Sequence, residues 1–172
     1  MRCFFGVPLP EEIRSSVSML ARKVNSSGAD VKTVEDENLH ITLYFLGDAE
    51  PEQIAGKMRT FTFAPFDVKL SGIGAFPDKK TPRVVWLGVS AGSEQLIDLN
   101  RRIVSTLRLA PDRFHPHITL ARVRSMRNAE KLQPLFSEKA EFEAFEVSSF
   151  TLFSSALTPS GPIYQKVASI PF

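Results

Sequence analysis

Two identical tetrapeptides, His-Ile-Thr-Leu, are the part of this sequence whose residue types and spacing suggest chemistry. They occupy residues 40–43 and 117–120 and contain two of the three histidines in the chain. Side chains alternate between the two faces of a β-strand, so the histidine and threonine of each tetrapeptide would share one face while the isoleucine and leucine point into the core. Each strand would then present an imidazole and a hydroxyl together.

Two imidazoles and two hydroxyls that meet in one groove would suit displacement at phosphorus. The ordinary pKa of imidazole is about 6.5, so one ring can take a proton from water while a protonated partner gives one to the departing alkoxide. Threonine hydroxyls can donate hydrogen bonds to the non-bridging phosphate oxygens, whose charge grows in the transition state. A 2′,3′-cyclic phosphate at an RNA end fits this scheme, because its ring is strained and its leaving group is an alkoxide. Such a proton relay requires no metal ion or other cofactor.

The tetrapeptides lie at matching places in an internal repeat. The order strand, helix, His-Ile-Thr-Leu strand and helix occurs twice, and 77 positions separate the two tetrapeptides. A long period that occurs only twice indicates two similar lobes, which would pack about a pseudo-twofold axis and place His40 opposite His117. The predicted strands are 2–7, 31–34, 39–46, 66–71, 83–88, 116–123, 145–155 and 163–169; the predicted helices are 10–25, 51–61, 93–108 and 128–136, with a loop over 72–82.

Fold class and cellular context follow from the mixture of elements and from the composition. Strands and helices without a regular strand–helix–strand alternation favour an α+β fold with mostly antiparallel sheets. The net charge is only +2, too small for a protein that binds nucleic acid through overall charge. Cys3 is the only cysteine, which excludes an intrachain disulfide and favours the reducing cytoplasm. No apolar stretch is long enough for a membrane span or a signal-peptide core, so we expect a cytoplasmic monomer with no membrane partner.

The paired His-x-Thr motifs, in LHITLYFLG and again in RFHPHITLAR, resemble the 2H phosphoesterase superfamily. Within it they are most similar to the LigT-like RNA 2′,3′-cyclic phosphodiesterases, also called 2′-5′ RNA ligases. The resemblance covers nearly the whole chain, including RCFFGVPLP, PRVVWLGV and PIYQKVASIPF. It implies one bilobal α+β domain over residues 1–172, with two pseudo-twofold-related, mostly antiparallel sheets around a central cleft and helices outside. It also implies metal-independent opening of the cyclic phosphate to a 2′-phosphate end, with 2′-5′ ligation of RNA as the reverse reaction.

The same resemblance implies a role for each motif residue. His40 would be the proton donor to the leaving 3′-oxygen and His117 the proton acceptor from water, an assignment that the symmetric motifs alone leave open. Thr42 and Thr119 would bind phosphate oxygens. Arg122 has the guanidinium that suits bidentate phosphate contacts. Strand alternation places it on the face opposite His117, however, so it would need a twist or a strand end to reach the cleft.

Several other residues are candidates for smaller roles. His115 is predicted at the rim of the cleft, although together with His40 and His117 it could supply three zinc ligands. Phe4 and Phe114 are candidates to stack on a terminal base. Arg83 and the Lys79-Lys80 loop could touch the RNA backbone but are better explained as solvated charges. Trp86 is predicted in the core.

Two other functions are compatible with these residues. One is a module that binds RNA ends without turnover, and the other is a phosphodiesterase that acts on a small cyclic nucleotide. Intact histidines and threonines in both motifs favour an enzyme, because a binding module could lose one pair.

Overall fold

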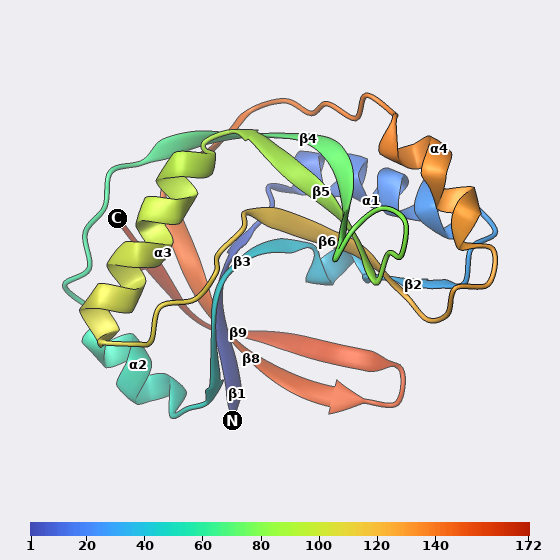
Figure 1. Cartoon of the computed structure of the whole chain (residues 1–172). Coiled ribbons are helices and arrows are strands. Elements are labelled where there is room, and N and C mark those ends of the chain that lie inside the picture. The colour runs from blue at the N-terminus through green and yellow to red at the C-terminus, as the bar shows by residue number, and fades with distance from the viewer.

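Nine antiparallel strands form one curled sheet in the computed structural model, which describes all 172 residues (Figure 1). The strand order is β7–β4–β5–β6–β3–β1–β8–β9, and β2 pairs with β6 outside this path. The predicted α+β class with mostly antiparallel pairing is therefore confirmed. The strands are β1 (Arg2–Pro8), β2 (Val31–Thr33), β3 (His40–Asp48), β4 (Phe66–Phe76), β5 (Val84–Ala91), β6 (His117–Val123), β7 (Phe145–Val147), β8 (Ser149–Thr158) and β9 (Gly161–Pro171).

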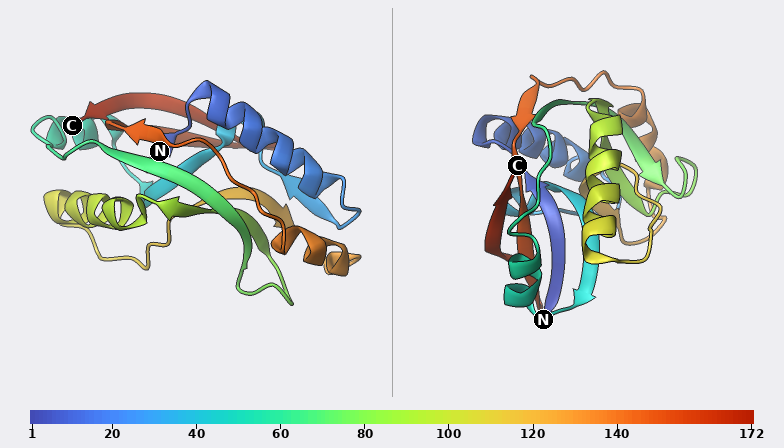
Figure 2. Two further views of the ribbon diagram at one scale, coloured as in Figure 1. Left: turned by 90° about the horizontal axis from the view of Figure 1, so that it is seen from above. Right: turned by 90° about the vertical axis from the view of Figure 1, so that its left-hand side faces the viewer.

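Helices cover the sheet from two ends. α1 packs against β2 and β6 and α4 against β4, whereas α2 packs against β8 and β9 and α3 against β3. Figures 1 and 2 accordingly show α1 and α4 at one end of the molecule and α2 and α3 at the other. No helix combines the length and apolarity needed to cross a bilayer. The α-helices are α1 (Glu11–Asn25), α2 (Pro51–Lys57), α3 (Ser93–Leu107) and α4 (Gln133–Phe136); the 3-10 helices are η1 (Asp36–Asn38) and η2 (Ala129–Leu132).

The isoleucine and leucine of each tetrapeptide anchor their strands in the core, as predicted. Ile41, Leu43, Ile118 and Leu120 are each at most 1% exposed and belong to one cluster of 34 buried apolar side chains. Full burial of such a side chain contributes about 1.5–3 kcal/mol to folding. Because neighbouring residues in a strand point to opposite faces, burial of these four side chains directs the preceding histidines and threonines to the other face.

The sheet consists of two halves that meet between β3 and β6. From this junction one half continues through β1, β8 and β9, and the other through β5, β4 and β7, so the repeated elements follow the same order outward. Ile41 and Ile118 form the register pair between β3 and β6, and they are also 77 positions apart. The two predicted sheets are thus joined into one, with the symmetry axis of the strand pattern between these two residues.

Some predicted boundaries were wrong. β4 continues to Phe76, through the first part of the predicted loop over 72–82. Glycines suggested a loop there, but Gly74 lies beneath the indole of Trp86, where a Cβ would overlap the ring. The second helix ends at Lys57 rather than at residue 61, because Gly56 weakens its last turn. The end of the chain forms three strands instead of two.

Candidate active site

One cavity of about 450 Å³ is lined by the histidine and threonine side chains of both tetrapeptides. His40 and Thr42 come from β3, and His117 and Thr119 come from β6. Arg122, near the end of β6, also lines this cavity. The structure therefore brings together all five residues that the sequence singled out for catalysis and phosphate binding.

The register between β3 and β6 arranges the four motif side chains around the junction. Because the strands are antiparallel and Ile41 pairs with Ile118, position 40 lies opposite position 119, and position 42 lies opposite position 117. The two imidazoles occupy one diagonal of a small square and the two hydroxyls occupy the other. All four side chains line the same cavity, and the charge of His117 acts on His40, so the two imidazoles lie close to each other.

Each imidazole is oriented by the backbone two residues before it. Nδ1 of His40 donates to the carbonyl oxygen of Asn38 at 2.6 Å, and Nδ1 of His117 donates to the carbonyl oxygen of His115 at 2.6 Å. A carbonyl oxygen can only accept, so Nδ1 carries the proton and Nε2 is left for chemistry. Nε2 of His40 lies 2.8 Å from Oγ1 of Thr42, whereas Nε2 of His117 has no hydrogen-bond partner within the protein.

The surroundings lower the pKa of both imidazoles. Burial lowers the pKa of His40, the carbonyl of Asn38 opposes this effect, and the charge of His117 lowers the pKa further. Burial likewise lowers the pKa of His117. The hydrogen bond to the carbonyl of His115 opposes this effect, and the charge of the His115 side chain lowers the pKa further. Both rings therefore favour the neutral form in the free protein. A phosphate anion between them would favour the protonated form.

Aromatic side chains and a glycine hold His40 in place. The ring centroid of Phe4 lies 5.0 Å from that of His40, and Tyr164 meets the imidazole edge-on at 5.5 Å. A Cβ on Gly6 would lie 3.0 Å from Cδ2 of His40, so this glycine lets the ring approach β1. Phe4 is only 2% exposed, and the prediction that it stacks on a base is therefore wrong. Phe114 packs against the core and does not line this cavity either.

A β-bulge explains why Arg122 reaches the cavity although strand alternation predicted the opposite face. Trp86 of β5 pairs with Thr119, and the next pair is Val85 with Ala121, so Leu120 has no partner. Leu120 and Ala121 are both fully buried. The extra residue shifts the alternation by one and returns Arg122 to the face of Thr119.

The same bulge occurs at the matching place in the first half. Gly6 of β1 pairs with Thr42 and Phe5 with Tyr44, so Leu43 is the extra residue. Regular alternation from Ile41 would place Phe45 on the core face, but its side chain is 69% exposed and lines the cavity. The same alternation would place Tyr44 on the face of His40, but its hydroxyl donates to the carbonyl oxygen of Ala110 at 2.8 Å.

The β8–β9 hairpin supplies a wall of the cavity that the sequence did not indicate. Nζ of Lys32 donates to the carbonyl of Ser160 at 2.6 Å, and Nδ2 of Asn38 donates to the carbonyl of Pro162 at 3.0 Å. Asn38 thus contacts His40 through its backbone carbonyl and the hairpin through its side-chain amide. Tyr164 on β9 also lines the cavity, and burial raises the pKa of its hydroxyl despite the nearby charge of Arg122. The 77-residue repeat could not reveal this hairpin, because it lies outside the repeat.

The smaller candidates lie on the other side of His117. His115 is exposed and its ring packs edge-on against Phe76, at the rim of a neighbouring cavity. No group of three or more histidine, cysteine, aspartate or glutamate residues is placed to hold a metal ion, so the zinc alternative has no support. Trp86 lines this neighbouring cavity, so its prediction as a simple core residue is wrong. Lys79 and Lys80 line it as well, whereas Arg83 lines neither cavity.

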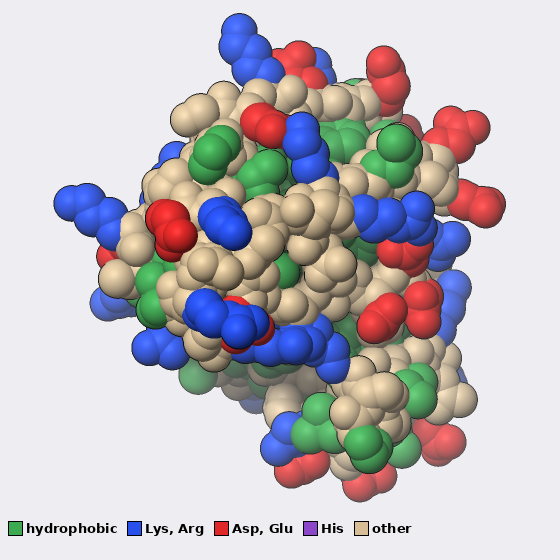
Figure 3. Space-filling model, turned by 90° about the vertical axis from the view of Figure 1, so that its right-hand side faces the viewer, with side chains coloured by type: hydrophobic (Ala, Val, Ile, Leu, Met, Phe, Trp, Pro, Cys, Tyr) green, Lys and Arg blue, Asp and Glu red, His purple; other side chains and the backbone are tan.

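Two positively charged side chains lie at the cavity. Lys32 pairs with Arg122 across β2 and β6, so the two cations lie side by side at the cavity. Figure 3 shows several Lys and Arg side chains on the face that corresponds to this end of the molecule, with Asp and Glu side chains among them. A phosphate-bearing ligand would be attracted to this end despite the small net charge of the chain.

Comparison with known proteins agrees with this fold. The family model described as the 2′-5′ RNA ligase superfamily matches residues 9–158, and the chain belongs to this superfamily. An RNA 2′,3′-cyclic phosphodiesterase of Aeropyrum pernix is 41% identical over 167 residues, which cover 90% of this chain and 95% of that protein. The structure of TT0787 of Thermus thermophilus is 30% identical, with a TM-score of 0.80 over 99% of this chain and 97% of that one. E. coli LigT complexed with 3′-AMP is 29% identical, with a TM-score of 0.76 over 98% of this chain and 95% of that one.

Proposed function

We propose that this protein hydrolyses the 2′,3′-cyclic phosphate at an RNA end to a 2′-phosphate, with His40 as proton donor and His117 as proton acceptor. One observation carries the proposal: two imidazoles from matching strands line one cavity, each fixed through Nδ1, which leaves Nε2 as the nitrogen for proton transfer. We infer further that residues 1–172 act as one bilobal domain, because this cavity takes residues from both halves of the sheet.

The reaction moves two protons and needs no other reactant than water. Nε2 of His117 takes a proton from water as its oxygen forms a bond to phosphorus. The bond from phosphorus to the 3′-oxygen breaks, and Nε2 of His40 gives its proton to that oxygen. Each of these proton transfers contributes roughly 10²–10⁴ in rate. The product keeps its phosphate on the 2′-oxygen, and a proton exchange with solvent returns both rings to their starting states.

Thr42, Thr119 and Arg122 would bind the phosphate itself. The two hydroxyls lie on the second diagonal of the square, where they can donate to the non-bridging oxygens. Arg122 adds a positive charge that does not titrate near neutral pH. These donors are in place before the charge on the phosphate oxygens develops, which is the condition for effective transition-state stabilisation.

Relatives support RNA as the substrate. The Aeropyrum pernix relative is named RNA 2′,3′-cyclic phosphodiesterase, and E. coli LigT has been solved with 3′-AMP. The superfamily description includes 2′-5′ RNA ligases. The same site can also join RNA ends through a 2′-5′ linkage, since a 5′-hydroxyl can replace water as the group that attacks the cyclic phosphate. The cytoplasmic location and the monomeric state stay predictions.

The test is an assay with a short RNA that ends in a 2′,3′-cyclic phosphate, run with and without a chelator. We expect conversion to a 2′-phosphate end at an unchanged rate in chelator, and loss of conversion with His117→Ala. Binding of this RNA without any change at its end would instead indicate a binding module. Equal efficiency on a cyclic mononucleotide and on the oligonucleotide would indicate a small-molecule phosphodiesterase.

A further inference from the structure

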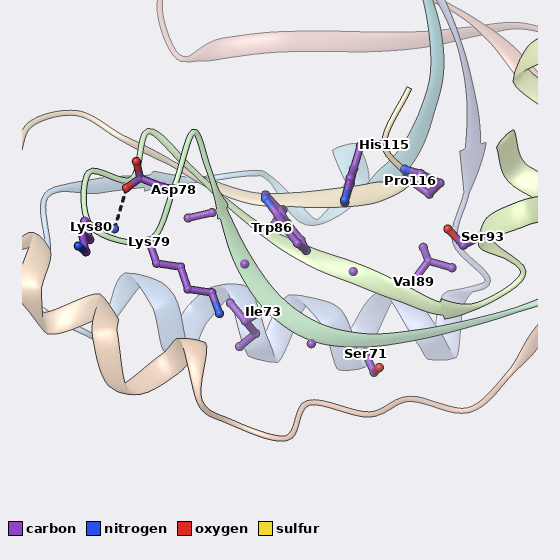
Figure 4. Close-up of a pocket in the computed structure, with 14 residues that line it drawn as sticks. Ser71, Ile73, Asp78, Lys79, Lys80, Trp86, Val89, Ser93, His115 and Pro116 are labelled. Atoms are coloured by element: carbon purple, nitrogen blue, oxygen red, sulfur yellow. Dashed lines mark hydrogen bonds between the residues drawn. The ribbon is translucent and has the colours of Figure 1, made fainter. Parts of the chain in front are cut away.

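A second cavity lies beside His117, and the mechanism above does not use it. Its volume is about 900 Å³, and its floor is formed by β4 and β5. Figure 4 shows Trp86 and His115 on one side of it and Lys79 and Lys80 at the loop between these strands. The sheet order β3–β6–β5–β4 places this cavity on the far side of His117 from His40. With strands about 4.8 Å apart, it begins next to the imidazole of His117.

One large ring, the indole of Trp86, covers glycines on the floor of this second cavity. Gly88 pairs with His117 and Trp86 pairs with Thr119, so all four residues share one face of the sheet. Gly74 pairs with Trp86 and lies beneath its indole, where a Cβ would overlap the ring. The indole therefore occupies the space over Gly74 and reaches Gly88, where a Cβ would lie 3.2 Å from the ring. The rest of the cavity forms a trough beside the indole, in which a flat group could lie.

Neither the internal repeat nor a hydrogen bond explains why residue 86 is a tryptophan. In the other half of the sheet, the residue that pairs with the motif threonine is Gly6 rather than an aromatic residue. The indole Nε1 of Trp86 is buried and has no hydrogen-bond partner, a cost that phenylalanine would avoid. The ring is held by packing alone, with Phe76 and His115 each at 5.2 Å between centroids. These features favour a role for the indole surface itself.

The loop after β4 supplies positive charge to this trough. The carboxylate of Asp78 already accepts hydrogen bonds from the backbone N–H groups of Lys80 and Thr81 at 2.8 Å and from the hydroxyl of Thr81 at 3.2 Å. That carboxylate therefore organises the loop, and the two lysines provide its free charge. Lys79 Nζ lies 5.7 Å from the ring of Phe136, and its side chain extends along the trough in Figure 4.

The side on which the trough lies decides which molecule it can hold. In an in-line displacement, the attacking oxygen and the leaving oxygen stand on opposite sides of phosphorus. The leaving 3′-oxygen belongs to the cyclic-phosphate RNA and is near His40 in the proposed function. The attacking oxygen is near His117, which is the side of the trough. The trough is thus placed for the group that attacks rather than for the group that leaves.

We propose that the trough binds a second RNA segment through its 5′-terminal nucleoside, with the base on Trp86, the following phosphate near Lys79 and Lys80, and the 5′-hydroxyl beside His117. This inference rests on the proposed function. In the joining step the 5′-oxygen forms a bond to phosphorus while its proton goes to Nε2 of His117. The bond from phosphorus to the 3′-oxygen breaks, and Nε2 of His40 protonates that oxygen. The product is a 2′-5′ linkage, and no other reactant is consumed.

The experiment compares two fates of one cyclic phosphate in the same tube. A cyclic-phosphate RNA is incubated with an excess of a 5′-hydroxyl RNA, and joined and hydrolysed ends are counted. We expect Trp86→Ala and the double variant Lys79→Ala/Lys80→Ala each to lower the ratio of joined to hydrolysed ends by about 10-fold, the range of one base stack or a few phosphate contacts. Trp86→Phe should recover most of the ratio.

The ratio separates this inference from its alternatives. A folding defect or a general loss of catalysis lowers both products and leaves the ratio unchanged. The matched control is Lys57→Ala/Lys139→Ala, which removes the same charge from exposed positions outside both cavities. A wild-type ratio in the trough variants, or no joined product from the wild-type protein, would overturn the inference while hydrolysis still supports the proposed function. Loss of hydrolysis only for long cyclic-phosphate RNA would also overturn it, because the trough would then hold the other strand.

Discussion

Ile41 and Ile118 pair across the junction of β3 and β6, and this one register pair sets the geometry of the candidate site. Both side chains are fully buried, so the residues on either side of each isoleucine point to the cavity. Antiparallel pairing at this point sets each histidine diagonally across from the other. A shift of the register by one residue would turn one motif into the core, and burial of two apolar side chains opposes such a shift.

The two imidazoles should act as a unit. His40→Ala and His117→Ala are each expected to lower the turnover of a cyclic-phosphate RNA by at least about 10², because each removes one proton transfer. The double variant should lose little more than the worse single variant. Turnover numbers and thermal midpoints of the three variants check this expectation. His115→Ala serves as the comparison and should lose less than about 10-fold, and full turnover by His40→Ala would contradict the mechanism.

The pH dependence should reflect the lowered pKa values of both histidines. The donor must be protonated and the acceptor neutral, so the free enzyme is reactive between two pKa values that both lie below the ordinary value of about 6.5. We therefore expect a bell-shaped kcat/KM with its maximum on the acidic side of about pH 6.5. The maximum of kcat should lie at higher pH, because bound phosphate favours the protonated rings. A kcat/KM that keeps rising above pH 8 would exclude this pair as the acid and base.

The two threonines should affect kcat more than KM. Thr42→Val and Thr119→Val keep the shape of the side chain but remove a donor to oxygens that gain charge in the transition state, so each should lower kcat by about 10-fold to 10². Thr42→Ser and Thr119→Ser keep the hydroxyl and should recover most of the rate. Steady-state kinetics on one substrate measure both parameters. A loss confined to KM would show that these hydroxyls bind ground state and transition state equally.

Arg122 should contribute mainly to binding of the phosphate. Arg122→Ala is expected to raise KM by about 10-fold or more, since a charge-assisted hydrogen bond contributes about 1.5–3 kcal/mol. Arg122→Lys keeps the charge and should lose less. The neighbouring Arg124→Ala is the matched control, because Arg124 is exposed and lies outside the cavity. Equal effects of the two alanine variants would mean that Arg122 acts only through general charge.

Strand alternation predicted one part of the site correctly and another part wrongly, and the difference has a local cause. Up to Thr42 and Thr119, each motif follows the two-residue period, and its histidine and threonine reach the cavity. After these residues one leucine in each half lies in a bulge, so Phe45 and Arg122 take the face opposite to the one that alternation predicts. A bulge depends on pairing with the neighbouring strand, and nothing in the sequence of β3 or β6 alone indicates it.

The sequence by itself determined which residues can do the chemistry and which strands present them, because the motif types, the strand period and the 77-residue repeat are all local or self-similar patterns. Only the tertiary structure decided what surrounds them. It placed Phe4 behind His40 rather than in the cavity, brought the β8–β9 hairpin to Asn38 and Lys32, and opened a trough beside the indole of Trp86. These contacts join segments far apart in the chain, and their geometry depends on sheet register, bulges and curvature, which are settled only when the whole sheet is assembled.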